Sequence, residues 1–293
     1  MSLSFGVLRD LVSLWHFFMK KKTLLVLKII ALGLFLLAAI FPLYWLFVTS
    51  IKDATETYSF PVSYWPKHPT LQNYFYLFKS MNFGRYLWNS LLASLSAASV
   101  ALFIASLSGY VMARKEFRGK GAILFLLFFT QMIPGFMLMG SLYILMAPLR
   151  LVNSLGVLIV LYTSMMVPFA SIMMRGFFER IPPSLEDAAL IDGCSQLQAL
   201  FRIILPVTLP GLAATFSFAF VNCWNELFLA IMFLDREMKK TLPVGLNSFI
   251  AKADINWGAM SAGAVVALLP TVLIFAFAQK YIVQGLTQGA VKG

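Results

Sequence analysis

Six hydrophobic segments, each long enough to cross a lipid bilayer, constrain this 293-residue chain more than any other feature. A helix needs roughly 20 apolar residues to span the hydrocarbon core of a membrane. The chain is 12% charged, whereas soluble domains are roughly 25% charged. We therefore predict an all-α polytopic membrane protein with six transmembrane helices. The predicted spans lie at about residues 24–48, 88–113, 121–146, 153–175, 208–234 and 258–283.

The uneven distribution of Lys and Arg predicts how the spans are oriented. The short loop at 114–120 contains four Lys or Arg residues, whereas the short loop at 147–152 contains only Arg150. Short loops rich in Lys and Arg remain on the cytoplasmic side of a membrane. Because the number of spans is even, both termini are predicted to lie inside, as is the polar stretch at 182–206. This bias also explains the net charge of +11 without a nucleic-acid partner.

A basic segment precedes the first span. Its apolar residues recur at steps of three and four, and the triplet Lys20-Lys21-Lys22 follows them. This pattern is typical of a helix that lies on a membrane surface. We predict a cytoplasmic amphipathic segment over residues 1–23 and a transmembrane domain over residues 24–293. A disordered basic tail is the alternative for the first segment.

Small residues recur at every fourth position of the second predicted span. Such a stripe allows another helix to approach closely, so this helix is predicted to lie inside a bundle. The stripe consists of Ala93, Ala97, Ala101, Ala105 and Gly109.

The loop between the first two spans, residues 52–85, is rich in aromatic residues and proline. This composition suits a folded cap on the outer side of the membrane. It equally suits an aromatic belt at the interface between membrane and water.

The polar stretch 182–206 interrupts the hydrophobic runs and carries the signals of two short helices. Ser184 with Asp187, and Ser195 with Gln198, have the spacing of helix-starting capping pairs. Gly193 provides a stop for the first helix, and Leu205-Pro206 ends the second. The first helix, about 185–191, is too short to be stable alone. It is predicted to display Leu185, Ala188, Ala189 and Ile191 to a docking partner.

Three strongly polar residues, Asn222, Asn225 and Glu226, lie within the fifth predicted span. A carboxylate inside a membrane helix is costly and faces a cavity or a partner helix. Two interpretations remain open. The cluster lines a translocation path, or it fixes this helix against its neighbour through hydrogen bonds.

Enzymatic chemistry finds no support in the sequence. There is no glycine-rich phosphate loop ending in Gly-Lys-Ser/Thr, no His/Cys metal cluster and no nucleophile motif. The two cysteines, Cys194 and Cys223, do not indicate a disulfide framework. We therefore predict no catalytic residue, no metal site and no directly bound cofactor.

The polar stretch resembles the EAA loop of binding-protein-dependent ABC importer permeases. The matching residues are Asp187-Ala188-Ala189, then Gly193, Ile203 and Leu205-Pro206 at the family's spacing. Asp187 stands where Glu is usual, although Glu186 precedes it. Ile181-Pro182 and Ile191-Asp192-Gly193 look like the carbohydrate-uptake branch, and in particular like the second, six-span permease of maltose-type importers.

This resemblance implies a transmembrane permease subunit of an ATP-driven importer in the bacterial cytoplasmic (inner) membrane. The cargo would be a sugar or oligosaccharide delivered by an extracytoplasmic solute-binding protein. A polyol, glycerol phosphate or acidic oligosaccharide is the alternative cargo, and a secondary transporter is the alternative class. The implied partners are a homologous second permease and two ABC ATPase subunits, which would bind ATP and Mg.

The resemblance also implies which residues couple the chain to the ATPases. The first short helix would dock into an ATPase as a coupling helix, with Gly193 as its elbow. The residues implied in coupling are Leu185, Glu186, Asp187, Ala188, Ala189, Ile191, Asp192, Gly193, Ile203, Leu205 and Pro206.

Overall fold

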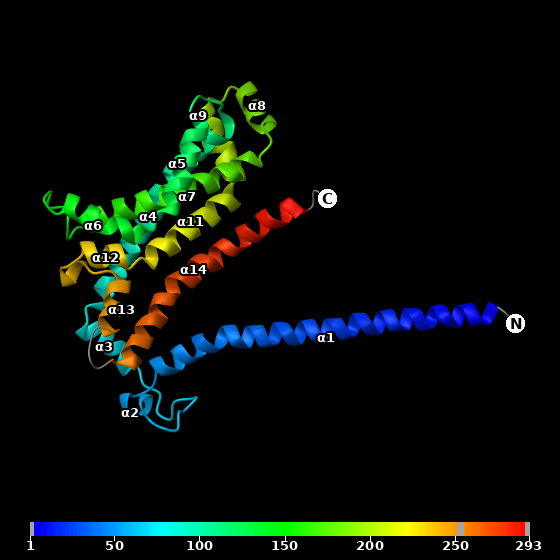
Figure 1. Cartoon of the computed structure of the whole chain (residues 1–293), viewed down its shortest axis with the longest axis horizontal. Helices are drawn as coiled ribbons and strands as arrows, with labels where there is room; N and C mark the ends of the chain where they lie inside the picture. The colour runs from blue at the N-terminus through cyan, green and yellow to red at the C-terminus, as the bar shows by residue number, and fades with distance from the viewer. Residues whose placement is uncertain (1–2, 251–254, 291–293) are drawn as a thin grey trace.

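The computed structural model of the protein describes the backbone of residues 3–250 and 255–290, with side-chain surroundings for residues 23–250 and 255–281. All regular structure in these ranges is helical (Figure 1). The α-helices are α1 Leu3–Ser50, α2 Ala54–Thr57, α3 Gln72–Ser80, α4 Phe83–Arg114, α5 Lys120–Met132, α6 Gly135–Met146, α7 Leu155–Glu179, α8 Ser184–Ile191, α9 Gln196–Ala199, α10 Leu205–Val207, α11 Leu209–Trp224, α12 Phe228–Phe233, α13 Leu242–Ile250 and α14 Trp257–Ala290. A π-helical turn, Leu200–Ile204, joins α9 to α10, and a short 3-10 turn covers Glu237–Lys239.

Helix α4 is the centre of the bundle, where it packs against α7 and α11. The four alanines of its small-residue stripe are fully buried. At Gly109 an added Cβ atom would lie only 2.8 Å from the backbone nitrogen of Arg175 on α7. The two helices therefore touch through their backbones, which confirms that α4 lies inside a bundle.

The predicted all-helical architecture is confirmed, but two of the six spans are not single helices. Among the residues that the structure describes, four helices are long and apolar enough to cross a membrane. The number rises to six if each of two bent pairs, α5 with α6 and Gln196–Val207 with α11, counts as one span. The window 121–146 is broken between α5 and α6, with a bend of 95°. Pro134 stands at this break, where its missing N–H and rigid ring prevent the helix from continuing. The window 208–234 is divided into α11 and α12.

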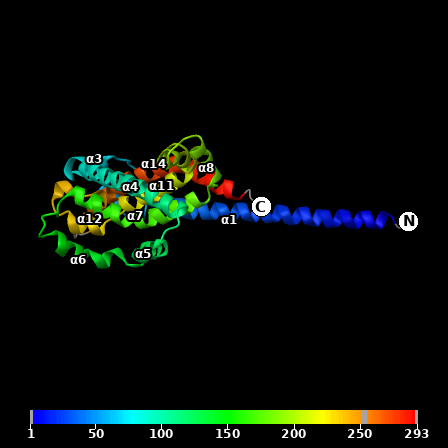
Figure 2. The same ribbon diagram turned by 90° about the horizontal axis from the view of Figure 1, so that it is seen from above.

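Helix α1 projects from the bundle as one long rod (Figures 1 and 2). Its apolar stretch Thr23–Ser50 has no buried residue in its most hydrophobic window, and α1 contacts α14 near its C-terminal end. The backbone is helical without a break from Leu3 to Ser50, so the helix of the first span extends back through the preceding segment as far as Leu3. The amphipathic pattern of that segment falls on side chains outside the described residues, and its placement on a membrane surface stays a prediction.

The loop that follows α1 is folded. The Glu56 carboxylate accepts hydrogen bonds from the Ser63 hydroxyl (2.6 Å) and from the Lys67 backbone N–H (3.1 Å). The hydrogen bond from Ser63 lowers the pKa of the Glu56 carboxyl below its ordinary value. Asn73 of α3 also donates to the backbone oxygens of Ser50 and Lys52. These contacts favour a folded cap, and the membrane-belt alternative stays open.

Candidate coupling loop and intramembrane polar cluster

Helix α8 projects at the opposite end of the bundle from α2, α3 and α13 (Figure 1). It begins at Ser184, directly after Pro183, whose φ of −58° already suits a helical start. Ser184 therefore lies inside the first turn, and the predicted cap between Ser184 and Asp187 is not formed. Instead, the negative charges of Glu186 and Asp187 in the first turn interact favourably with the positive N-terminal end of the helix dipole.

The C-terminal end of α8 has the predicted glycine stop. Gly193 adopts a φ of +85°, which only glycine reaches without steric penalty. Its N–H donates to the oxygen of Leu190 (3.1 Å), and the N–H of Cys194 donates to the oxygen of Ala189 (3.0 Å). These two hydrogen bonds form a Schellman motif, which ends the helix and turns the chain sharply.

The second short helix starts as predicted and ends later than predicted. Ser195 and Gln198 form a reciprocal capping box, with backbone N–H to side-chain oxygen distances of 3.3 and 2.8 Å. The helix widens into the π-helical turn and continues to Val207, so Leu205-Pro206 does not end it. The wide turn accommodates Pro206, which lacks an N–H to donate. The chain then bends by 80° into α11.

Helix α8 has an inner and an outer face. Ala189 and Glu186 point inward, with exposed fractions of 2% and 8%. Leu185 and Ile191 are exposed at 42% and 86%, and Ala188 is also exposed. The prediction that Ala189 is displayed outward is therefore wrong, because the helical turn of 3.6 residues places it on the face opposite Ile191.

The two adjacent carboxylates of α8 have different surroundings. Glu186 accepts a hydrogen bond from Arg114 Nε at 3.0 Å and another from the Tyr110 hydroxyl. Glu186 is thus paired within the chain, and its place among the residues implied in coupling stays a prediction. Asp187 is exposed. Sequence reasoning missed Tyr110 and Arg114 as partners of the loop, although their spacing of four residues puts them on one face of α4.

The remaining residues of the predicted coupling set lie beside α8 or in the second short helix. Asp192 and Pro206 are exposed, and Ile203 and Leu205 are half-buried. The residues that carry the internal packing of this region are Leu200 and Ile204, which are fully buried.

The three polar residues of the fifth predicted span have different surroundings. Glu226 lies at the break between α11 and α12, where it accepts hydrogen bonds from Leu229 N (2.8 Å), Ala230 N (3.2 Å) and the Tyr162 hydroxyl (3.0 Å). It caps α12 and ties it to α7, which favours the structural interpretation for this carboxylate. Asn222 and Asn225 are exposed, and each donates to the backbone oxygen four residues earlier.

An aromatic pair lies beside the exposed asparagines. The rings of Phe169 on α7 and Phe218 on α11 stack with centroids 4.1 Å apart. Phe218, Asn222 and Asn225 follow one another at steps of four and three, so they share a face of α11. These side chains form a surface of aromatic rings and amides, which we call the amide–aromatic face (Phe169, Phe218, Asn222, Asn225).

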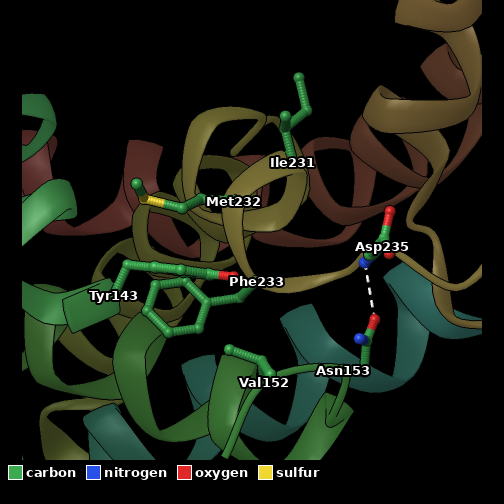
Figure 3. Close-up of a pocket in the computed structure, with 7 residues that line it drawn as sticks. All are labelled: Tyr143, Val152, Asn153, Ile231, Met232, Phe233 and Asp235. Atoms are coloured by element: carbon green, nitrogen blue, oxygen red, sulfur yellow. Dashed lines mark hydrogen bonds between the residues drawn. The ribbon is translucent and has the colours of Figure 1, made fainter. Parts of the chain in front are cut away.

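A cavity of about 330 Å³ lies between α6, α12 and the loop that precedes α7 (Figure 3). Tyr143 and Phe233 meet edge to face across it, with ring centroids 6.0 Å apart. The Asn153 amide oxygen is already used, because it accepts from the backbone N–H groups of Asp235 and Arg236. The ring contact and these two hydrogen bonds therefore join the α12 region to α6 and to the loop that precedes α7. The described residues also contain no group of three or more potential metal ligands.

The chain matches a known family over residues 101–288, the family described as binding-protein-dependent transport system inner membrane component. It is 34% identical to the sulfoquinovosyl glycerol transport system permease protein SmoH of Agrobacterium fabrum, over 91% of this chain and 94% of the relative. It is 33% identical to the trehalose/maltose transport system permease protein MalG of Thermococcus litoralis, over 92% of this chain and 97% of the relative. The fold is similar to a chain of a bacterial ABC transporter for alginate import, with a TM-score of 0.76, 23% identity and coverage of 88% and 95%.

Proposed function

Because the chain belongs to the family of binding-protein-dependent transport system inner membrane components, we propose that it carries a sugar or oligosaccharide across the membrane. As a permease of a binding-protein-dependent ABC importer, it is a multi-pass inner-membrane subunit and is not itself an ATPase. Permease subunits bind no cofactor, and ATP binds to the partner ATPases.

The cargo proposal is supported by the amide–aromatic face. Amides donate and accept hydrogen bonds as sugar hydroxyls do, and aromatic rings pack against the apolar faces of sugar rings. Amides of this kind are disfavoured toward lipid, so the face is expected to line a path or contact a partner helix. None of the four residues of the amide–aromatic face carries a charge. An uncharged face favours a neutral sugar over glycerol phosphate or an acidic oligosaccharide.

Uptake measurements test the cargo. A complex reconstituted in liposomes with its ATPase and solute-binding protein should accumulate at least one labelled neutral disaccharide from a panel of trehalose, maltose and cellobiose. Labelled glycerol phosphate and a labelled dipeptide are the comparison solutes. Uptake of either of these without uptake of any disaccharide would contradict the proposal.

The proposal for energy coupling is based on the projecting helix α8. Its outer face exposes Leu185 and Ile191 at the tip of the bundle, and an isolated two-turn helix needs such apolar residues to be covered. We propose that this face docks into a cleft of an ATPase, with Asp187 rather than Glu186 as the carboxylate at the contact. ATP-driven closure of two ATPases would then move α8 together with the bundle.

The remaining partners follow from the surfaces that the bundle leaves open. Helices α5 and α6 have no buried residue, and neither does the most hydrophobic window of α1. Lipid and a homologous second permease are proposed to cover these surfaces. The solute-binding protein is proposed to meet the opposite end of the bundle, which carries α2, α3 and α13.

Crosslinking tests the docking of α8. In a Cys194→Ala background, where the remaining Cys223 is buried, Ala188→Cys should form a crosslink to an ATPase subunit in the assembled complex. Ala189→Cys is the matched control, because the neighbouring Ala189 points into the chain and should not crosslink. Equal crosslinking at both positions, or none at 188 in an intact complex, would refute the docking surface.

A further inference from the structure

A buried contact ties α8 to the central helix α4. Glu186 and Arg114 form an ion pair with an Nε–Oε2 distance of 3.0 Å, and each side chain is only 10% exposed. The Tyr110 hydroxyl donates to the other oxygen of the same carboxylate. The second arm of the Arg114 guanidinium donates to the backbone oxygen of Ile181 at 2.9 Å. Both carboxylate oxygens of Glu186 are therefore engaged, as are Nε and Nη2 of Arg114.

These groups come from separate elements. Glu186 lies in the first turn of α8, Tyr110 and Arg114 are one turn apart at the end of α4, and Ile181 lies in the link from α7 to α8. The ring of Tyr110 also meets the fully buried Phe178 of α7 edge to face, at 5.9 Å between centroids. The contact thus joins the start of α8 to two helices of the bundle.

The ion pair connects α8 to α4 in addition to the covalent links of the chain. The covalent links to α8 are the segment 180–183 and the turn at Gly193, neither of which is helical. Removing one partner of a buried ion pair leaves an uncompensated charge, so α8 cannot tilt away from α4 without a large penalty. On the bundle side, Gly109 precedes Tyr110 and touches the backbone of α7. A displacement of the α4 end must therefore be passed on to α7.

We propose that Arg114 and Tyr110 are positioning residues that, through Glu186, transmit the displacement of α8 to α4 and thereby couple ATP hydrolysis to transport. This inference rests on the proposed function of α8 as the ATPase-docking helix. In this proposal Glu186 belongs to the contact between α8 and α4, whereas the outer face of α8 contacts the ATPase.

The test measures ATP hydrolysed per molecule of solute taken up by the reconstituted complex, using the panel disaccharide that the wild-type complex accumulates. Glu186→Gln and Arg114→Gln should each raise this ratio by about tenfold, because one buried charge loses its partner. The Ala188→Cys crosslink to the ATPase should persist in both variants. The exchange of charges in Arg114→Glu/Glu186→Arg should recover part of the coupling that either single replacement loses.

Matched controls come from another Arg–Glu pair at the same end of the molecule. Arg175 and Glu179 also pair through Nε, at 2.7 Å, but both lie on α7 and are more exposed. Arg175→Gln and Glu179→Gln should leave the ratio unchanged. Tyr110→Phe, which removes only a hydroxyl, should raise the ratio by about threefold. This variant still tests the inference if the charge variants do not assemble.

Three results would overturn the inference. The first is an unchanged ratio in Glu186→Gln or Tyr110→Phe, and the second is an equal effect in the α7 controls. The third is loss of both the Ala188→Cys crosslink and solute uptake in Glu186→Gln or Arg114→Gln. That result would mean that the ion pair is needed for docking of the ATPase rather than for transmission of its movement. Absence of the crosslink in the wild-type background would instead contradict the proposed function itself.

Discussion

The substitution Gly193→Val should leave the protein in the membrane and lower transport by at least about fivefold. Gly193 has a φ of +85°, and this left-handed conformation costs other residues about 1–2 kcal/mol, with β-branched side chains among the least tolerated. A penalty of that size changes the population of the closed turn by about 5–30-fold. The Schellman motif would open, α8 would lose its defined end, and movement of the ATPase would no longer reach the spans. Solute uptake and ATP hydrolysis by the reconstituted complex measure this loss of coupling.

A graded series separates backbone strain from steric clash at this turn. No atom lies within 4 Å of a Cβ added at Gly193, so crowding does not contribute. Asn tolerates the left-handed conformation better than Ala, and Ala better than Val. Uptake should therefore decrease in the order Gly193→Asn, Gly193→Ala, Gly193→Val. Full activity of Gly193→Val in an assembled complex would contradict the role of this turn.

Gly109→Ala should destabilise the bundle by about 1–3 kcal/mol, which is the usual penalty for inserting a methyl group into a closely packed interface. The new Cβ would lie 2.8 Å from Arg175 N and 2.9 Å from Met174 Cβ. The first of these atoms belongs to the backbone of α7, so α4 and α7 would have to separate along their contact. Thermal unfolding of the detergent-solubilised protein should show a clear decrease in midpoint temperature.

Gly176→Ala is the control for this effect. Gly176 lies within α7, close to the same contact in sequence, but nothing lies within 4 Å of its added Cβ. Because Ala favours a helix over Gly by about 1 kcal/mol, this variant should unfold at the same or a higher temperature. A similar decrease in both variants would show that the close approach at Gly109 is not the cause.

The positions of the hydrophobic segments were largely predictable, but their breaks were not. The second span was predicted at 88–113, and α4 covers Phe83–Arg114. The helix breaks within the third and fifth segments were not predicted, because hydrophobicity reports only transfer from water to lipid. Hydrophobicity contains no information about the direction of the backbone. The first break lies at Pro134, whereas the break at Glu226 depends on the N–H groups of α12 and the hydroxyl of Tyr162.

The polar stretch 182–206 likewise contains some features that the sequence predicts and others that it does not. The Gly193 stop and the capping box of Ser195 are confirmed because each depends on hydrogen bonds within a few residues. The cap at Ser184 is not formed because α8 begins at Ser184 itself, directly after Pro183 and one residue earlier than predicted. The inward direction of Ala189 depended on where the bundle lies relative to α8, and no local pattern contains that information.

The sequence by itself determined the class of the molecule, the number of hydrophobic segments and the location of the polar stretch 182–206 between them. These depend on the lengths of apolar runs, on the positions of charges and on the conformational limits of single residues. Only the tertiary structure decided that Glu186 faces inward while Asp187 faces outward. The decisive partner, Arg114, lies 72 residues away along the chain. Contacts over such a distance are selected by the packing of α4 against α7, which brings together groups that no local sequence pattern connects.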